Sequence, residues 1–281
     1  MSTPDLPRRV DAHVHLWRLA RGDYDWMSPS LEPLFRDFDL SDLEPLLGRA
    51  KMHQAILVQA AATVAETEFL LEIAESSRRI AGVVGWVDLA APDVLSTLRE
   101  LAARPALRGI RPMIQFIPDP LWMLRPELAA GWNAIANLGL TLDCLVTPTH
   151  LEALHSLLAR HPSLRAVIDH AAKPAIAGGE FTDWARAMTR IARDTHAYCK
   201  LSGLITEAGS GWKVESLRPY VEHLLAEFGP TRLLFGSDWP VVMLAGDYST
   251  WFDAACELLR GASAAEHEAI FGSTATQCYR L

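Results

Sequence analysis

The sequence predicts a closed barrel of eight parallel β-strands alternating with helices, the (β/α)₈ or TIM-barrel fold. Apolar, β-branched runs alternate with amphipathic helical patterns along the whole chain of 281 residues. Eight such units recur at spacings of roughly 25–35 residues after a longer first unit, which favours parallel strands joined by crossover helices. No GxGxxG motif follows the first strand, which disfavours the alternative, a doubly wound open sheet. We therefore expect one barrel domain over residues 1–281.

The first expected strand alternates apolar residues with Asp11, His13 and His15, and this period of two is typical of a β-strand. The other seven are short apolar runs, as the buried strands of a parallel sheet usually are. In chain order the strands are expected at Val10–Leu16, Ala55–Gln59, Ala81–Asp88, Leu107–Ile114, Leu140–Val146, Leu164–His170, Ala197–Gly203 and Arg232–Asp238.

The segments between the strands carry apolar residues at helical spacing. Two of them open with helix-start signals, because Pro92 and Asp93 stand in one first turn and Pro148 precedes Thr149 in another. The expected helices are Ser41–Ala50, Val64–Ser77, Pro92–Ala103, Pro126–Ala136, Thr149–Arg160, Thr182–Thr195, Glu215–Phe228 and Asp247–Leu259, followed by two short helices from Ser263 onward.

A long loop over residues 17–40 follows the first strand, and we expect it to cap the site. It contains the aromatic residues Trp17, Trp26, Phe35 and Phe38. Such rings more often belong to a core, but sugar-binding sites also use them.

Composition and charge exclude several partners. The chain has 26 Lys and Arg against 34 Asp and Glu, a formal net charge of −8, and no basic run, so neither nucleic acid nor an anionic membrane is expected. The apolar stretch 55–65 is too short to span a membrane, and the N-terminal MSTPDLPRR lacks an apolar signal core. Four widely spaced cysteines without a CxxC motif suit reduced thiols in a cytoplasmic protein. The oligomeric state is unknown from the sequence.

The segment RRVDAHVHL, residues 8–16, is the most informative one for function. His13 and His15 project to the same side of the expected strand, with Cα atoms roughly 6.5–7 Å apart. Two imidazoles so placed can converge on one ion or one substrate oxygen, although two hydrogen-bonded core histidines would give the same pattern. Asp11 points the same way one layer deeper, where we expect it to support them.

Polar and ionisable residues end nearly every expected strand. In a (β/α)₈ barrel the chemistry lies where the strands end and the following loops begin. A histidine such as His170 is costly to bury unpaired at the end of an apolar strand, and Asp238 has no evident structural duty except a helix cap. In strand order these residues are His13 and His15; Gln59; Trp86 and Asp88; Arg111; Asp169, His170 and Lys173; Lys200, Ser202 and Glu207; and Asp238.

The motifs DAHVHLW, VIDHAAKP, CKLSGLITEA and FGSDWPV, in that order, resemble those of the amidohydrolase superfamily of the amidohydrolase-2 type. More narrowly, they resemble its sugar-lactonase branch, which includes L-fucono-, L-galactono- and L-rhamnono-lactonases and a pyrone-dicarboxylate lactonase. The resemblance spans the chain from Val10 to Tyr279. It implies that the catalytic and possible metal-binding residues are His13, His15, His170 and Asp238.

The same resemblance implies substrate contacts by Arg111, Gln59 and Trp26, and we add Lys173 from the loop after the sixth strand. Each has a structural alternative. Arg111 could instead form an ion pair with an acid such as Asp88, a glutamine can satisfy loop backbone, and a lysine can brace a loop or face solvent. Lys200 is expected to be such a bracing or solvated lysine.

The chain departs from the binuclear members of the superfamily, which need a carbamylated lysine on strand four and a histidine on strand five. The fourth strand here ends in Arg111-Pro112 and the fifth contains Asp143-Cys144. Three histidines and an aspartate could still hold a single divalent ion, of which zinc is the best match to imidazole ligands. Because the lactonase branch also includes members that work without a metal, metal-free activity stays open.

These features predict the hydrolysis of a sugar-acid lactone by an activated water. Asp238 would take the proton of the water and return it to the ring oxygen, while the histidines, directly or through an ion, stabilise the oxyanion. The sequence contains no GxSxG motif, which disfavours an acyl-enzyme route. The alternatives are a metal-dependent decarboxylase of the amidohydrolase-2 type, a dicarboxylate lactonase that acts on aromatic-degradation intermediates, and a non-catalytic barrel that binds sugars.

Overall fold

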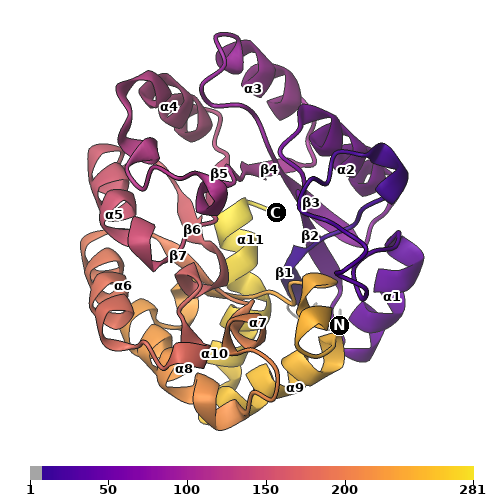
Figure 1. Ribbon diagram of the computed structural model, residues 1–281, viewed down its shortest axis with the longest axis vertical. Helices are drawn as coiled ribbons and strands as arrows, with labels where there is room; N and C mark the ends of the chain where they lie inside the picture. Colours follow the sequence, from indigo (N-terminus) through magenta and orange to yellow (C-terminus); the bar gives the residue numbers. More distant parts are fainter. Residues whose placement is uncertain (1–7) are drawn as a thin grey trace, which may run out of the picture.

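The structure, a computed structural model, describes residues 8–281. Most of the N-terminal segment MSTPDLPRR, in which the sequence shows no apolar signal core, lies outside this range. Its eight strands follow one another in parallel in the order β1 to β8, and helices surround them (Figure 1). The ring closes where β8 returns to β1, since Val14 bridges Trp239 and the amide of Asp238 donates to the carbonyl of His13 at 2.9 Å. The predicted (β/α)₈ barrel is confirmed.

The strands are short, with three to six residues each. Their bounds are β1 Val10–Val14, β2 Gln54–Val58, β3 Ile80–Gly85, β4 Leu107–Ile110, β5 Thr141–Cys144, β6 Ala166–Ile168, β7 Tyr198–Leu201 and β8 Leu233–Phe235.

The α-helices lie outside the ring, apart from those at the C-terminus. Their bounds are α1 Leu40–Arg49, α2 Val64–Ser76, α3 Val94–Ala102, α4 Ala129–Asn137, α5 Leu151–Arg160, α6 Thr182–Asp194, α7 Leu204–Ala208, α8 Val214–Phe228, α9 Tyr248–Leu258, α10 Ala264–Glu268 and α11 Thr274–Tyr279.

Most predicted strands extended too far at their carboxyl ends. The sixth was expected to reach His170 and the eighth Asp238, but β6 ends at Ile168 and β8 at Phe235. His170 and Asp238 have φ values of 51° and 58°, and a residue in this left-handed conformation cannot continue a strand. His170 and Asp238 therefore stand on loops rather than in the sheet, whereas His13 and Lys200 lie within β1 and β7.

The helix predictions need smaller corrections. Helix α7 was not predicted, and tight 3₁₀ turns at Pro126–Leu128 and Pro148–His150 precede α4 and α5. A proline fits the first position of such a turn because it needs no hydrogen-bond partner for its nitrogen. The C-terminal pair of short helices is joined through a π-helical turn.

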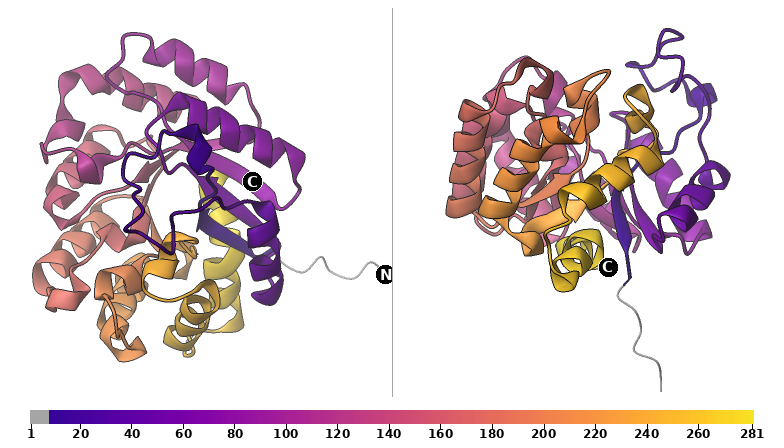
Figure 2. Two further views of the ribbon diagram at one scale, coloured as in Figure 1. Left: turned by 45° about the vertical axis from the view of Figure 1, so that its right-hand side comes forward. Right: turned by 90° about the horizontal axis from the view of Figure 1, so that it is seen from below.

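The last helix, α11, lies across the end of the barrel opposite the polar loops (Figure 2, right). The hydroxyl of Thr141 on β5 donates to the carbonyl of Cys278 at 2.7 Å. The hydroxyl of Tyr279 donates to Asp143 Oδ2, also at 2.7 Å. Because α11 closes this end, the barrel opens only at the carboxyl ends of its strands.

The segment 17–40 rises beside that opening (Figure 2). Trp17 pairs its backbone with Phe38, and the rings of these two residues pack edge to face with their centroids 5.2 Å apart. The indole nitrogen of Trp26 donates to the carbonyl of Ala60 at 2.7 Å, which ties the segment to the loop after β2.

The buried carboxyl group of Glu66 binds the backbone of this loop after β2. Glu66 Oε2 accepts the amides of Ala60 and Ala61 at 2.9 and 2.5 Å. Burial raises the pKa of Glu66 to about 7, although the two amides act in the opposite direction.

A second buried carboxyl group fastens β1 to the chain that follows β8. Asp11 Oδ1 accepts the amides of His13 and Ser237 at 3.2 and 2.9 Å, and Asp11 Oδ2 accepts the hydroxyl of Tyr248 at 2.9 Å. Burial raises the pKa of Asp11 to about 6. Since Ser237 precedes Asp238, Asp11 positions the loop that carries Asp238, and its bond to the amide of His13 agrees with the predicted support of the histidines.

Within residues 8–281, the helices lack the combination of length and apolar character that a membrane span needs.

Replacing Asp11 by alanine should lower the midpoint of thermal unfolding, because the amide of Ser237 and the hydroxyl of Tyr248 lose their buried acceptor. Each buried group left unsatisfied costs about 1–3 kcal/mol, and each kcal/mol shifts Tm by about 2–4 °C in a domain of this size. Asp253→Ala, an exposed position on α9, is the control and should barely change Tm. An Asp11→Ala protein as stable as its parent would contradict the role given to Asp11.

The raised pKa of Glu66 predicts a pH-dependent stability. Between about pH 5 and pH 7 the folded chain keeps a proton on Glu66 that the unfolded chain releases, so the free energy of unfolding should fall as the pH rises through this window. Glu66→Gln removes the titrating group, and its unfolding free energy should change less with pH. Chemical denaturation of both proteins across the window measures this, and parallel pH dependences would be the opposing result.

Candidate active site

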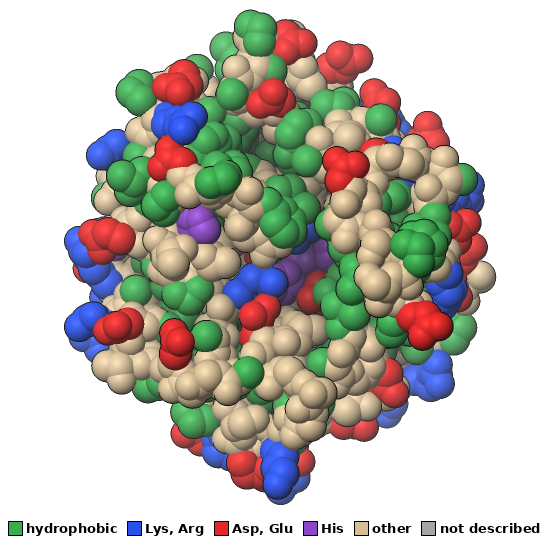
Figure 3. All heavy atoms as spheres, in the orientation of Figure 1, with side chains coloured by type: hydrophobic (Ala, Val, Ile, Leu, Met, Phe, Trp, Pro, Cys, Tyr) green, Lys and Arg blue, Asp and Glu red, His purple; other side chains and the backbone are tan. Residues whose placement is uncertain are grey.

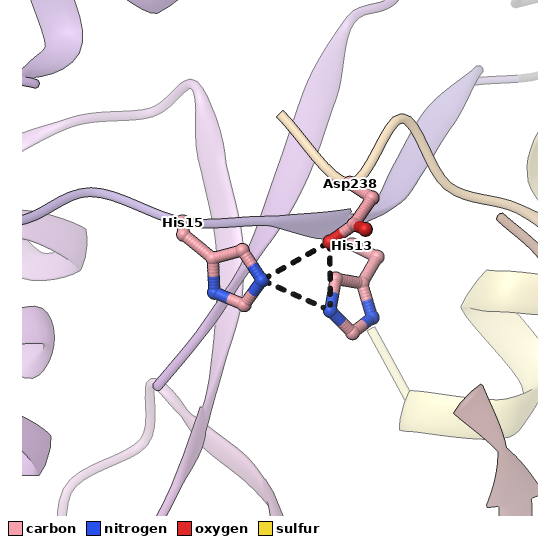
Figure 4. Close-up of side chains that lie close together, drawn as sticks. All are labelled: His13, His15 and Asp238. Atoms are coloured by element: carbon pink, nitrogen blue, oxygen red, sulfur yellow. Dashed lines mark hydrogen bonds and ion pairs between the residues drawn. The ribbon is translucent and has the colours of Figure 1, made fainter. Parts of the chain in front are cut away.

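The side chains of His13 and His15 leave β1 on the same face and meet the carboxylate of Asp238 (Figure 4). The two Nε2 atoms are 3.2 Å apart. Asp238 Oδ1 lies 3.3 Å from Nε2 of His15 and 3.7 Å from Nε2 of His13. His15 Nδ1 donates to the carbonyl of Val58 at 2.7 Å, which fixes the orientation of this ring.

His170 joins this cluster from a left-handed turn. Four consecutive non-glycine residues, 170–173, have φ values from 51° to 60°, a conformation that costs roughly 1–2 kcal/mol per residue. The turn brings His170 Nε2 to 3.9 Å from Asp238 Oδ1, and its Nδ1 lies 2.9 Å from the hydroxyl of Ser202. A Cβ on Gly203 would lie 2.7 Å from His170 Nδ1, so only glycine leaves room for the ring.

The charge state of this cluster suits proton transfer. Burial lowers the pKa of His170 to about 4, so the ring is neutral at pH 7. Burial opposes ionisation of Asp238, but the surrounding rings, His170 first, hold the pKa of this carboxyl below its ordinary value. Asp238 is therefore an ionised proton acceptor at neutral pH, although a low pKa also makes it a weak base.

A buried ion network lies beneath the histidines. The ammonium of Lys200 is 2.5 Å from Asp143 Oδ2, 2.9 Å from Asp169 Oδ1 and 3.0 Å from His13 Nδ1, and all four side chains are fully buried. Burial disfavours the charge of Lys200, but the two carboxylates raise its pKa above the ordinary value. The prediction that Lys200 braces a loop or faces solvent is therefore wrong. Lys200 is buried and contacts a candidate catalytic histidine directly.

Arg111 is held at the edge of the same network. Its guanidinium donates to Gln59 Oε1 through Nε and Nη2 at 3.1 and 2.8 Å, and Nη2 also donates to the backbone carbonyl of Gln59. Nη1 lies 3.4 Å from both Asp169 Oδ2 and His13 Nε2. The alternative ion pair with Asp88 does not form, because Asp88 is exposed. Gln59 is fully buried and touches Arg111 instead of lining the cavity.

A cavity of about 310 Å³ opens above the cluster. It appears as a hollow in the middle of the molecular surface, with histidine, basic and acidic side chains inside it (Figure 3). Lys173 and Glu207 form an ion pair of 2.9 Å at its wall, and Trp26 and Leu31 line it from the segment 17–40. The polar and charged residues that line it are His15, Arg111, Gln115, His170, Lys173, Thr206, Glu207 and Asp238.

A second cavity of about 580 Å³ adjoins the first and is mainly apolar. The two share Trp26, Ala60, Met113 and Phe116, so their walls are continuous. Asp88, one of the sequence-predicted strand-end residues, lines only this second cavity.

The donor set of the cluster fits one divalent ion. In the part of the chain that the structure describes, two groups of three potential ligands have their ligand atoms within 4.8 Å of one another: His13, His15 and Asp238, and His13, Asp169 and His170. Both contain His13, which favours a single ion over two. Imidazole nitrogens with one carboxylate oxygen form the ligand set that zinc accepts.

Sequence reasoning missed the roles of Asp143 and Lys200. A signal was present, because each places a charge inside an otherwise apolar strand, in TLDC and YCKL. Charges of opposite sign on strands that flank β6 indicate a buried pair across the barrel, since an isolated charge would be too costly to bury.

Three comparisons place the chain among known proteins. A family model described as amidohydrolase matches residues 10–281. L-Fucono-1,5-lactonases of Burkholderia ambifaria and Burkholderia multivorans are 42% and 38% identical over 279 and 288 residues, with 97% of this chain and 96% of each of those proteins covered. A crystal structure of an amidohydrolase from B. multivorans with bound zinc is 38% identical, has a TM-score of 0.90, and covers 98% of this chain and 99% of that one.

The family match spans nearly all of the described residues, and the geometry agrees with it. The HxH pair at the end of β1, the histidine after β6 and the aspartate after β8 are brought together at the mouth of the barrel. This chain belongs to the amidohydrolase family.

Proposed function

We propose that this chain hydrolyses the lactone of a sugar acid to the open-chain acid, with L-fucono-1,5-lactone as the first substrate to test. The observation that carries this proposal is Asp238, an ionised carboxylate close to three histidines at the floor of an open cavity. The names of the two curated relatives support the substrate class. The reaction places the enzyme among hydrolases of carboxylic ester bonds.

In the proposed mechanism Asp238 removes a proton from a water as that water attacks the lactone carbonyl. The carbonyl oxygen gains negative charge, which the N–H groups of His13 and of Arg111 stabilise. The C–O bond of the ring then breaks, and Asp238 returns the proton to the departing ring oxygen. General acid–base catalysis of this kind contributes roughly 10²–10⁴-fold. A divalent ion, when bound by His13, His15 and Asp238, would add Lewis-acid polarisation of the carbonyl.

The substrate contacts follow from the walls of the cavity. Arg111 presents its guanidinium beside His13, and the Lys173–Glu207 pair offers both a donor and an acceptor to ring hydroxyls. Trp26 supplies an aromatic face of the kind that sugar rings stack on. Gln59 acts on the substrate only through Arg111, which it holds. We also propose that the segment 17–40 caps the site.

The alternatives have less support. Decarboxylases and dicarboxylate lactonases share the barrel, but the curated relatives at 42% and 38% identity are both sugar lactonases. A pH-indicator screen of aldonolactones and dicarboxylate lactones, run with and without chelator, distinguishes them. Turnover of an aldonolactone supports the proposal, whereas release of CO₂ from a hydroxybenzoate without any lactone hydrolysis would favour a decarboxylase.

Replacing Asp238 by asparagine should lower kcat on an aldonolactone by at least ~10²-fold with a smaller change in KM, because the shape is kept and the proton acceptor is lost. Steady-state kinetics of the purified variant measures this. Asp88→Asn is the matched control, since this exposed carboxylate lines only the neighbouring cavity. Glu207→Gln tests the other carboxylate in the catalytic cavity. If Asp238→Asn kept the parent kcat while Glu207→Gln abolished it, the base would be Glu207.

The ligand set predicts at most one divalent ion per chain, because both groups of potential ligands depend on His13. Elemental analysis of active protein should find no more than one equivalent, with zinc the best fit. Two equivalents at full activity would refute a mononuclear site. Activity that survives exhaustive chelation would mean that hydrogen bonds from His13 and Arg111 suffice to polarise the carbonyl.

A further inference from the structure

The hydrogen bond at one imidazole nitrogen decides whether the other nitrogen of a neutral histidine is free to bind a metal. His15 is preset for binding, because its Nδ1–H donates to the carbonyl of Val58 and leaves Nε2 without a proton. His170 has the same opportunity, since its Nδ1 lies 2.9 Å from the hydroxyl of Ser202, which can accept. Both free Nε2 atoms face Asp238.

His13 is preset in the opposite way. Its Nδ1 lies 3.0 Å from the ammonium of Lys200, which has three protons to donate and no lone pair to accept with. Lys200 also donates to Asp143 Oδ2 and forms an ion pair with Asp169 Oδ1 at 2.9 Å. A neutral His13 must therefore accept at Nδ1 and carry its own proton on Nε2.

The contact between His13 and His15 agrees with a proton on Nε2 of His13. His13 Nε2 lies 3.2 Å from Nε2 of His15, and one of these two atoms must donate. The bond to Val58 leaves Nε2 of His15 as the acceptor, so Nε2 of His13 is the donor. One direction of donation then runs from Lys200 through His13 and His15 to Val58. Arg111 Nη1, also a donor only and 3.4 Å from His13 Nε2, has Asp169 Oδ2 as its acceptor at the same distance. Nε2 of His15 faces Asp238 Oδ1 at 3.3 Å without a proton of its own.

We propose that Lys200 is a positioning residue that holds His13 in its Nε2–H form and thereby weakens the binding of a divalent cation by the group His13, His15 and Asp238. A cation on His13 Nε2 would displace that proton to Nδ1, where it would point at the ammonium of Lys200. Asp169 Oδ1, which has no hydrogen-bond partner of its own within residues 8–281, lies 3.5 Å from Nδ1, longer than an ordinary hydrogen bond.

The positive charges around His13 act in the same direction. The ammonium of Lys200 and the guanidinium of Arg111, the latter 3.4 Å from His13 Nε2, both repel an incoming cation. In the absence of a cation, the N–H of His13 is directed at His15 and lies 3.7 Å from the carboxylate of Asp238, which it stabilises. The inference concerns the same site as the proposed function, but neither measurement below uses a lactone, so the two can fail separately.

The first test reads the proton position directly. Nitrogen NMR of the chelator-treated protein, labelled with ¹⁵N-histidine, separates a protonated ring nitrogen from a bare one, and comparison with His13→Gln identifies the signals of His13. We expect Nε2 of His13 to be protonated and Nδ1 to be bare. A proton on Nδ1 would overturn the proposal, and the proton position itself is measured on the parent protein.

The second test measures zinc affinity by competition with a chromophoric chelator at one fixed pH. Lys200→Met should bind zinc about 10- to 100-fold more tightly than the parent, the range over which such outer hydrogen bonds change metal affinity. Lys173→Met is the matched control, because it removes a positive charge from the wall of the same cavity, where Lys173 pairs with Glu207. The gain in zinc affinity of Lys173→Met should be clearly smaller than that of Lys200→Met.

A second variant separates the proposed effect on the proton of His13 from two other effects of Lys200→Met. Lys200→Met leaves two buried carboxylates without their cation, which threatens folding and frees Asp169 as a new ligand. The double change Lys200→Met with Asp169→Asn balances the charge and removes that ligand, so a retained gain in affinity supports the role of His13. No gain in this folded protein, or an equal gain in Lys173→Met, would contradict the proposal.

Discussion

The ammonium of Lys200, enclosed by Asp143, Asp169 and His13, is the interaction on which the site depends. The interior of a (β/α)₈ barrel is normally a packed apolar core, and removing ions from water costs several kcal/mol each unless their partners are well placed. Here the ammonium donates to Asp143 and His13 and forms an ion pair with Asp169, and Tyr279 of the closing helix α11 donates to the same oxygen of Asp143. Lys200 therefore orients His13, the first histidine of the candidate cluster.

Above that floor, backbone geometry brings the remaining groups together. His170 and Asp238 both adopt left-handed conformations at the points where β6 and β8 end, and strain of this kind persists only where the surroundings enforce it. Gly203 admits the ring of His170, and Asp11 fastens the chain before Asp238 to β1. The cluster is thus fixed by elements that contribute no group to the reaction, which explains why a site assembled from three separate strands can be so compact.

The sequence predicts the barrel and the four central residues well, because both depend on repeating signals. Alternation places His13 and His15 on one face, and polar residues at the ends of apolar runs mark His170 and Asp238. The sequence misses the extent of the strands, since a left-handed residue such as His170 does not differ in composition from a strand residue. It also misplaces Lys200, because the partner that decides whether a lysine is buried or solvated comes from another strand, and only the closed barrel brings the two together.

The account centres on attack of water at the lactone carbonyl with Asp238 as the base. A single turnover in H₂¹⁸O, with protein in excess over L-fucono-1,5-lactone and the product analysed by mass spectrometry, tests this most directly. The account predicts one ¹⁸O atom in the carboxylate of the product from the first turnover and none in the hydroxyl released from the ring. Unlabelled product in that first turnover would show that an enzyme carboxylate attacks the carbonyl, and label in the released hydroxyl would show that the other C–O bond breaks. Either result would contradict the account.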